Sequence, residues 1–436
     1  MSWYNKGRKK ESENMNNFSA FLEAKIAPLA SKIGGNRYLQ SVRDGLIASM
    51  PVMIVGSFAL VITEFPINAY QDFMLATFGE GWKWFGDIAS SSTMGLTALI
   101  AVFSIAYYLG KSYHRDALMS GVMSLVSYFI LLIRVDGGFQ ASDFGAKGLF
   151  VAIITAIIAV ELFNFVLSKN LTIKMPEGVP PAVSRSFEAL IPAVVILPMF
   201  LVIRFIFSLT PWESIHAFVF NILQVPLVGV SDSFLGIVTA ICASHTLWFF
   251  GIHGASVVGA ITGPLFQSAS LNNLTAFTAG QPLPHVVTQQ FWDMFQGWGG
   301  VGATLPLSII MIFFCKSKQI KMLGKLTLGP GIFGINEPMV FGLPLVLNPT
   351  MLIPFFACPL MCVTVSYWAM NLGLVSCTTG TNIPWTTPPI ISGFLATNDW
   401  RAAVLQAILL VVCGLIYYPF IKVLDKKMVE EEKMSD

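Results

Sequence analysis

Apolar positions along the chain gather into ten long runs separated by shorter polar segments. A helix needs about 20 apolar residues to cross a bilayer, and these runs approach that length. They cover residues 46–63, 93–110, 117–133, 148–167, 189–209, 234–250, 255–271, 301–315, 351–375 and 402–421. The seventh and eighth runs are short or interrupted by Gly and Pro. The pattern predicts an all-α polytopic membrane protein with about ten transmembrane helices, five in each half.

Two further apolar stretches, residues 285–300 and 328–349, contain Gly, Pro and single polar groups. Irregular backbone at membrane depth is tolerated only where it is buried in protein or lines a hydrated cavity. We therefore expect both stretches to be re-entrant hairpins, which often form transport sites. Residues 210–233 contain Pro211 and Pro226 and are expected to form an interfacial connector.

The hydrophobic pattern therefore predicts a division of the chain into five parts. These are a cytoplasmic N-terminal segment (1–45), a five-helix domain (46–209), the connector (210–233), a second membrane domain with the two hairpins (234–424) and a cytoplasmic tail (425–436).

Positive charges orient these spans, because cytoplasmic loops retain Lys and Arg. Ten spans place both termini on the same side. All but five of the 26 Lys and Arg residues then fall on cytoplasmic segments. The exceptions are Lys83, Arg134, Lys147, Arg204 and Arg401. The first 45 residues are polar and basic, which argues against a secretory signal, so both termini are expected in the cytoplasm.

Composition excludes several classes of function. Only 11% of the residues are charged, against about 25% in an ordinary soluble domain. The net charge of +2 gives no basic excess of the kind that binds nucleic acid. The six cysteines lie in apolar runs without a CxxC pair. The chain has no P-loop, HExxH or GxSxG motif, so we expect no metal, no cofactor and no ATP hydrolysis by this chain.

Two isolated carboxylates are candidate functional groups. Asp293 and Glu337 are the only acidic residues between Ser233 and Asn398, and each lies in one of the proposed hairpins. A charge at membrane depth costs several kcal/mol, so such a residue is a functional candidate. Glu337 follows Asn336 and precedes a proline, where a broken backbone can present a carboxylate and an amide together. The alternative is an inner-surface glutamate that caps a half-helix.

Histidine and tryptophan add a chemistry that suits sugars. His253 lies between two glycines where the sixth run turns into the seventh. A neutral imidazole there can bind a hydroxyl or shuttle a proton, or it can simply pack at a helix end. Trp248, Trp298 and Trp385 all lie in the second half. A pyranose packs its apolar face on an aromatic ring and needs donors and acceptors around its rim; the alternative for the tryptophans is an interfacial aromatic belt.

The segment at residues 334–349, GINEPMVFGLPLVLNP, resembles a motif of the membrane IIC component of phosphoenolpyruvate-dependent sugar phosphotransferase systems. The resemblance is to the lactose, cellobiose and diacetylchitobiose family, and to diacetylchitobiose carriers above all. Three further segments support it: 43–57 (RDGLIASMPVMIVGS), 245–254 (HTLWFFGIHG) and 379–389 (TGTNIPWTTPP). The likeness extends over residues 18–426.

This resemblance implies a multi-pass permease of the bacterial inner membrane, a homodimer that dimerises through its first half and binds sugar in its second. It also implies a separate partner, IIB, whose phosphocysteine phosphorylates the sugar 6-hydroxyl on delivery to the cytosol. The IIC chain carries no phosphoryl group, so phosphotransferase activity belongs to the complex with IIB. The sugar is expected to be a β-linked disaccharide, N,N'-diacetylchitobiose or cellobiose.

Site roles also follow from the resemblance. Asn336 and Glu337 are expected to hold sugar hydroxyls, and Glu337 or His253 to assist removal of the hydroxyl proton. The remaining expected binding residues are Trp248, Trp298, Trp385, Asp293 and Asn382. A different hypothesis is a proton-coupled secondary transporter that releases unmodified sugar, with Asp293 or Glu337 as its proton site. A channel or scaffold leaves the clustered His, Glu and Trp unexplained.

Overall fold

The computed structural model describes residues 35–435, apart from positions 66, 136, 174, 177, 250–252, 344 and 346–347. The described chain is almost entirely helical. Its one described sheet is a two-stranded antiparallel ribbon with Arg134 opposite Phe139 and Val135 opposite Gly138. The prediction of an all-α membrane protein is therefore confirmed.

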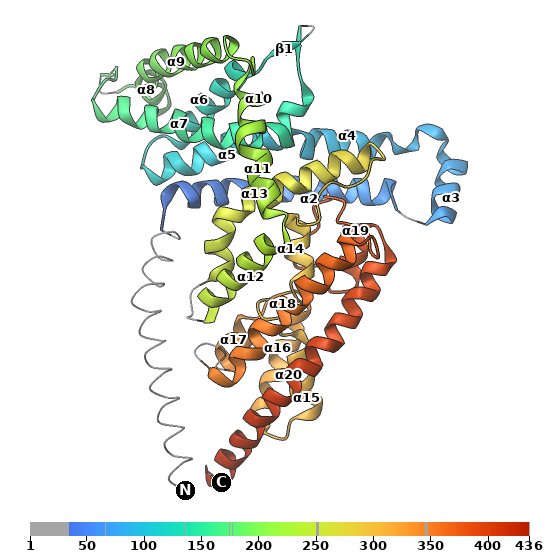
Figure 1. The fold of residues 1–436 in the computed structure, drawn as a ribbon. Helices are drawn as coiled ribbons and strands as arrows, with labels where there is room; N and C mark the ends of the chain where they lie inside the picture. The colour runs from blue at the N-terminus through green and yellow to red at the C-terminus, as the bar shows by residue number, and fades with distance from the viewer. Residues whose placement is uncertain are drawn as a thin grey trace.

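The first half of the chain forms the upper layer in Figure 1, coloured from blue to green. Its elements are α2 (Arg37–Thr63), α3 (Asn68–Phe78), η1 (Glu80–Lys83), α4 (Trp84–Thr93), η2 (Met94–Leu96), α5 (Thr97–Ser112), α6 (Ala117–Leu131), β1 (Arg134–Val135), β2 (Gly138–Phe139), η3 (Ala141–Phe144), η4 (Ala146–Gly148), α7 (Leu149–Ser168), α8 (Pro181–Glu188) and α9 (Leu190–Ser208). Polar side chains set two of the helix starts. Asn36 accepts backbone N–H bonds at the start of α2, and Asp116 does so at the start of α6.

Small residues allow the helices of this half to pack closely. Ala98, Ala101 and Ala106 of α5 are fully buried. At Gly45 of α2, a Cβ would come within 2.7 Å of the backbone nitrogen of Ile105. Backbones that approach through small residues are typical of membrane helix pairs. Helix α5 is thus the centre of this layer, in contact with α2, α6 and α7.

Two charged groups inside this layer bond to neighbouring helices. The hydroxyl of Tyr113 donates to Oε1 of Glu161 at 2.5 Å. Nη1 of Arg204 donates to the backbone oxygen of Ile130 at 3.0 Å. Both contacts join segments that are distant in sequence, so each charge has a structural partner within the protein.

Helices α10 and α11 run down beside the upper layer, and most of the chain from α12 onward lies below it and ends in the long red helix α20 (Figure 1). Its elements are α10 (Ile215–Val219), the π-helical turn η5 (Phe220–Gln224), α11 (Val225–Ser231), α12 (Phe234–Phe249), α13 (Gly254–Thr278), α14 (Gln289–Phe295), α15 (Leu305–Phe314), α16 (Lys318–Ile332), α17 (Glu337–Gly342), α18 (Pro349–Asn371), α19 (Ile391–Thr397) and α20 (Trp400–Ser435).

Helix α13 connects the two halves. Val257 and Phe266 belong to a buried cluster of the second half, whereas Leu271 and Leu274 pack into the cluster of the first half. Gln224 reinforces the joint, because its Nε2 donates to the oxygen of Ala146 at 3.0 Å and to Ser268 Oγ of α13 at 2.8 Å. The sequence predicted a split between the halves but not a helix shared by both cores.

The proposed hairpin segments are irregular, and the first residues of the second one belong to helix α16. Residues 285–300 contain the short helix α14 and the beginning of a glycine-rich loop. Helix α16 begins at Lys318, because Ser317 caps it by accepting from the N–H of Ile320. It packs against α15. The predicted start at residue 328 therefore falls inside a helix that carries polar lysines at its beginning.

Every predicted span lies on a helix, but not every such helix is long. Six helical segments of the described chain are long and apolar enough to cross a membrane, and a seventh results if α10–α11 and α12, bent by 72°, are one span. Helices α6 and α15 are apolar but shorter. The predicted count of about ten therefore includes helices that are shorter than a full membrane span, such as α6 and α15.

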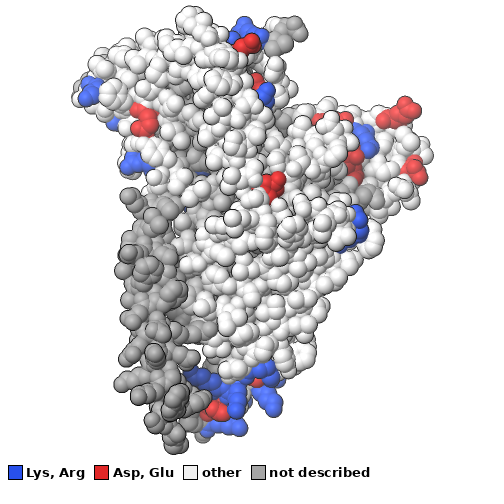
Figure 2. Space-filling view, in the orientation of Figure 1, with Lys and Arg blue, Asp and Glu red and all other residues white. Residues whose placement is uncertain are grey.

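Charged side chains gather at the lower end of the molecule, where α20 ends (Figure 2). Asp425 of α20 accepts the backbone N–H groups of Lys316 and Ser317 at 2.8 Å. Glu432 accepts the Ser317 hydroxyl at 2.6 Å. These carboxylates hold the lysine-rich α15–α16 turn against α20, in agreement with the side that the sequence assigns to the cytoplasm.

Candidate functional site

A cavity of about 300 Å³ lies inside the second half, where five segments converge. Ligand pockets are typically about 300–1,000 Å³, so this one is at the small end. The end of α12, the start of α13, helix α14 with its following loop, the α16–α17 junction and the 385–389 loop supply its lining. Six of the expected site residues line it: Trp248, His253, Asp293, Trp298, Asn336 and Trp385.

The loop after α14 forms one wall and requires glycine. Gly299 and Gly300 have φ values of +84° and +80°, a region that residues with a Cβ rarely adopt. Space is also lacking. A Cβ at Gly299 would lie 2.2 Å from the nitrogen of Leu305, and one at Gly300 would lie 2.4 Å from the Asn336 side chain. The string of glycines in GWGGVGA was visible in the sequence, but its role as a cavity wall was missed.

Three buried side chains hold this loop from three different elements. Nε2 of His245 on α12 accepts the N–H of Gly302 at 3.1 Å, and the Tyr417 hydroxyl on α20 donates to the oxygen of Gly302 at 2.6 Å. Nδ1 of His245 lies 2.9 Å from the oxygen of Ile241. These two contacts fix a neutral imidazole with its proton on Nδ1. His245 therefore holds the cavity loop.

Asn336 is the third of these side chains. Its Nδ2 donates to the oxygen of Val301 at 2.7 Å and to Thr304 Oγ1 at 2.9 Å. Both amide hydrogens are used on the loop, and only Oδ1 remains for a ligand. The residue next to it, Glu337, begins α17, but its side chain lies outside the described part of the structure.

Trp248 and Trp298 line the cavity, and each carries a buried hydrogen-bond donor. Each side chain is 5% exposed, and neither indole Nε1 has a partner in the described structure. An unsatisfied buried donor costs about 1–3 kcal/mol. Buried tryptophans usually place this group against an acceptor, so both are suited to an oxygen atom of a ligand.

His253 has its protonation pattern fixed by local structure. It caps α13, with Nδ1 accepting the backbone N–H of Ser256 at 3.1 Å. A backbone N–H can only donate, so Nδ1 carries no proton and the neutral ring carries it on Nε2. The ring centre lies 4.4 Å from that of Trp248. In this arrangement His253 offers a donor to the cavity and is not a base.

The other lining groups have separate roles. Asp293 is half-buried and accepts a hydrogen bond from Gln289 at 3.1 Å. Trp385 is half-exposed and lines the cavity, and a Cβ at Gly334 would lie 3.4 Å from its ring, which is an ordinary contact distance. The lining thus includes a carboxylate and an accessible aromatic surface.

Asn382 does not join this group. Its backbone N–H donates to Ser57 Oγ at 2.6 Å, and its side chain contacts the sulfur of Met53 at 3.8 Å. Both partners belong to α2 of the first half. Asn382 is not among the described residues that line the cavity, and it lies at the contact between the two halves.

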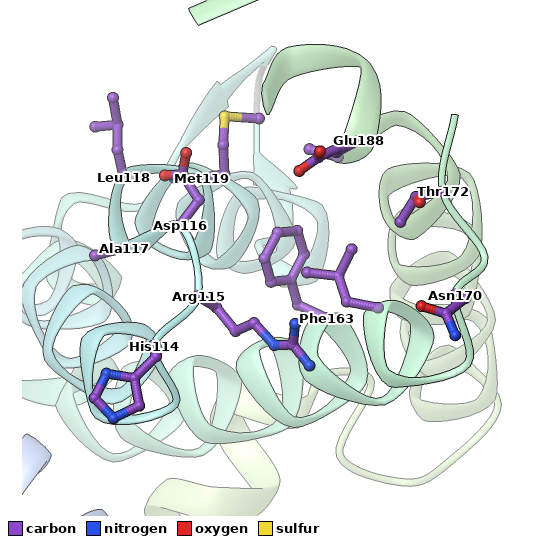
Figure 3. Close-up of a pocket in the computed structure, with 12 residues that line it drawn as sticks. His114, Arg115, Asp116, Ala117, Leu118, Met119, Phe163, Asn170, Thr172 and Glu188 are labelled. Atoms are coloured by element: carbon purple, nitrogen blue, oxygen red, sulfur yellow. The ribbon is translucent and has the colours of Figure 1, made fainter. Parts of the chain in front are cut away.

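A larger cavity, of about 830 Å³, lies in the first half and has different chemistry. Its polar lining comes from Arg115, Asp116, Asn170, Thr172 and Glu188, with Phe163 as its one aromatic ring among the described lining residues. Figure 3 shows Arg115 extending beneath Phe163 and His114 directed away from both. The smaller cavity, with several tryptophans, fits a sugar better. No group of His, Cys, Asp and Glu in the described chain is arranged for a metal ion.

Comparison with known families decides the class of protein. Residues 43–359 match the family described as "Phosphotransferase system, EIIC". The chain belongs to this EIIC family. The resemblance indicated by the sequence motifs is thus confirmed, and this EIIC chain is a multi-pass membrane transporter of the phosphotransferase system.

Individual relatives of this EIIC chain match over nearly its whole length. The "Lichenan permease IIC component" of Bacillus subtilis (strain 168) is 43% identical over 433 residues, which is 96% of each chain. The "PTS system cellobiose-specific EIIC component" of Geobacillus stearothermophilus is 41% identical, over 96% of this chain and 97% of the relative. The crystal structure of the transporter ChbC, titled as the IIC component from the N,N'-diacetylchitobiose-specific phosphotransferase system, superposes with a TM-score of 0.92 at 43% identity, covering 95% of this chain and 99% of ChbC.

Proposed function

We propose that this EIIC protein binds a β-linked disaccharide, N,N'-diacetylchitobiose or cellobiose, carries it across the membrane and presents its 6-hydroxyl to phosphorylated IIB in the cytosol. The observation that carries the proposal is the second-half cavity, where Trp248, Trp298 and Trp385 meet polar groups. Aromatic faces and a mixed polar rim are what a pyranose requires. Two of the relatives are named for cellobiose and for N,N'-diacetylchitobiose, which are disaccharides of this class.

Each half has a proposed role. The second half binds and moves the sugar. The first half serves as the scaffold and as the contact in a homodimer, which is consistent with the exposed apolar side chains of α9, such as Val194 and Phe205 at 66% and 63% exposure. Such side chains need lipid or another subunit to cover them.

We assign removal of the hydroxyl proton to one residue and binding of the sugar to others. Glu337 acts as the general base, because the fixed proton on Nε2 leaves His253 a donor. Asp293 and Trp385 hold the sugar, and Asn336 holds the loop while its Oδ1 faces a ligand hydroxyl. Phosphoryl transfer depends largely on positioning and electrostatic stabilisation, so a site without its own nucleophile is sufficient when IIB supplies the phosphoryl group.

The test is uptake of radiolabelled diacetylchitobiose and cellobiose into vesicles that contain the protein, with and without phosphorylated IIB. We expect sugar 6-phosphate inside only when phosphorylated IIB is present, and the better substrate identifies the sugar. Unmodified sugar that accumulates with a proton gradient, without IIB, would instead establish a secondary transporter with Asp293 or Glu337 as its proton site.

A further inference from the structure

The cavity proposed for the sugar has no lysine or arginine among its described lining residues. The proposed reaction nevertheless brings a phosphoryl group to it. Charge in phosphoryl transfer is spread over three oxygen atoms, and enzymes stabilise it with cations or with fixed hydrogen-bond donors. If the residues that line this cavity stabilise the charge on the phosphoryl group, they must do so with neutral hydrogen-bond donors.

The carbonyl groups of the glycine loop have hydrogen-bond partners, whereas several of its N–H groups do not. Every carbonyl from Trp298 to Gly302 already accepts a hydrogen bond. The donors, in order from the Trp298 carbonyl to the Gly302 carbonyl, are the Leu305 N–H at 3.0 Å, the Thr304 hydroxyl at 2.6 Å, the Ala303 N–H at 3.1 Å, Asn336 Nδ2 at 2.7 Å and the Tyr417 hydroxyl at 2.6 Å. By contrast, the N–H groups of residues 298–301 donate to no acceptor in the part of the chain that the structure describes.

Two side chains add to this one-sided pattern. Trp248 and Trp298 both line this cavity, and their indole N–H groups are buried without a described partner. A sugar hydroxyl both donates and accepts, so a hydroxyl site mixes both kinds of group. A phosphoryl oxygen only accepts. Unpaired backbone N–H groups in consecutive left-handed or turn conformations are a known form of anion site.

The loop is also rigidly held, as such a site requires. His245, Tyr417 and Asn336 fix it from α12, α20 and the α16–α17 junction. Donors fixed before the reaction need no reorganisation when charge develops, which makes them more effective than the same donors in water.

We propose that the indole N–H groups of Trp248 and Trp298, with the N–H groups of the 298–301 loop, form a cation-free cradle for the phosphoryl group during its transfer to the sugar. The proposal rests on the proposed function. In this step the sugar 6-oxygen forms a bond to phosphorus while the S–P bond of the IIB phosphocysteine breaks. Sulfur leaves as the thiolate, and the hydroxyl proton passes to the general base.

The test compares binding of the free disaccharide with binding of its 6-phosphate by calorimetry on the purified protein. The variants are Trp298→Phe and Trp248→Phe, which remove the N–H and keep an aromatic ring. We expect the 6-phosphate to bind about 10-fold more weakly, which is a loss of about 1.4 kcal/mol, because a hydrogen bond to a charged group is removed. Sugar binding should change less than about threefold, and transfer from phosphorylated IIB should slow by a similar factor of about 10.

Trp368→Phe is the matched control, because Trp368 lies on α18, is 44% exposed and is not among the residues that line the cavity. It should bind both ligands as the unmodified protein does. Equal weakening of sugar and 6-phosphate in the two cavity variants would overturn the proposal by making these donors sugar ligands. Unchanged 6-phosphate binding would overturn it as well. Failure of the unmodified protein to form any 6-phosphate with IIB would instead refute the proposed function, and the cradle with it.

Discussion

The two halves of the molecule each contain a cavity, and the larger one is not the better sugar site. The first-half cavity is about 830 Å³ and is lined by charged residues, with Phe163 as its one phenyl ring among the described lining residues (Figure 3). The second-half cavity is about 300 Å³ and combines tryptophans with unpaired donors and a carboxylate. The comparison shows that the chemical match to a ligand is a better guide to function than volume.

Two charged groups inside the first half differ in their surroundings from the carboxylate that lines the second-half cavity. In the first half, Glu161 and Arg204 each bond to another helix. In the second half, Asp293 has Gln289 as its hydrogen-bond partner and faces a cavity. A partnered charge holds helices together, whereas a charge or donor beside an open cavity is available to a ligand. Four substitutions, ordered from the largest expected effect to the smallest, test this distinction.

Glu337→Gln should have the largest effect, because it keeps the side-chain shape and removes the proposed base. We expect phosphoryl transfer to fall about 100-fold to 10,000-fold, the usual range for loss of a general base, and sugar binding to weaken. The assay is formation of sugar 6-phosphate in vesicles with phosphorylated IIB. Glu161→Gln is the matched first-half control and should retain transfer. Normal transfer by Glu337→Gln would remove this residue from the mechanism.

Substitutions of His253 test whether this residue binds the ligand or only caps α13. Asparagine is a good helix cap but does not reach as far as Nε2 of histidine. We therefore expect His253→Asn to keep thermal stability and to lose about 10-fold in transfer, while His253→Gln loses a similar amount of transfer with some stability. Full activity of His253→Asn would show that His253 only caps α13 and does not contact the ligand.

Tyr417→Phe tests whether a residue outside the cavity lining holds the glycine loop in position. It removes the hydroxyl that donates to Gly302 and leaves a buried carbonyl without that partner. A lost hydrogen bond of about 1 kcal/mol corresponds to about fivefold, and we expect this loss in sugar affinity if the loop shifts. Thermal unfolding should be measured alongside, since loss of stability with unchanged affinity would make Tyr417 a packing residue alone.

Arg204→Ala should have the smallest effect on function. Its bond to Ile130 lies in the first half, so sugar affinity should stay within about twofold while the melting temperature falls. Calorimetric sugar binding and a melting curve check both. A large loss of affinity in a folded variant would show that the division of roles between the halves is wrong.

The sequence predicted the helices and most of the cavity residues, for reasons that are local. Apolar run length determines where a span can form, and isolated polar groups such as Asp293 and His253 stand out in an apolar background. Tertiary features were harder to predict. The contact of Asn382 with α2 joins residues more than 300 positions apart, and no local pattern encodes it.

The hydrogen bonding of the glycine-loop backbone was the other feature that the sequence did not predict. The glycines of the 297–302 loop were visible, but the pairing of its carbonyls depends on Asn336 and Tyr417, which are remote in sequence. The start of α16 was missed because its polar lysines and its Ser317 cap interrupt the apolar pattern used to find helices. Contacts of this kind can be read only from the folded chain.

The most direct test of the central claim is a structure of the protein with bound diacetylchitobiose. The claim is that the sugar lies in the second-half cavity. We expect density for the disaccharide beside Trp248, Trp298 and Trp385, with its 6-hydroxyl toward Glu337. Density in the first-half cavity beside Arg115 and Glu188, with the second-half cavity empty, would contradict the account.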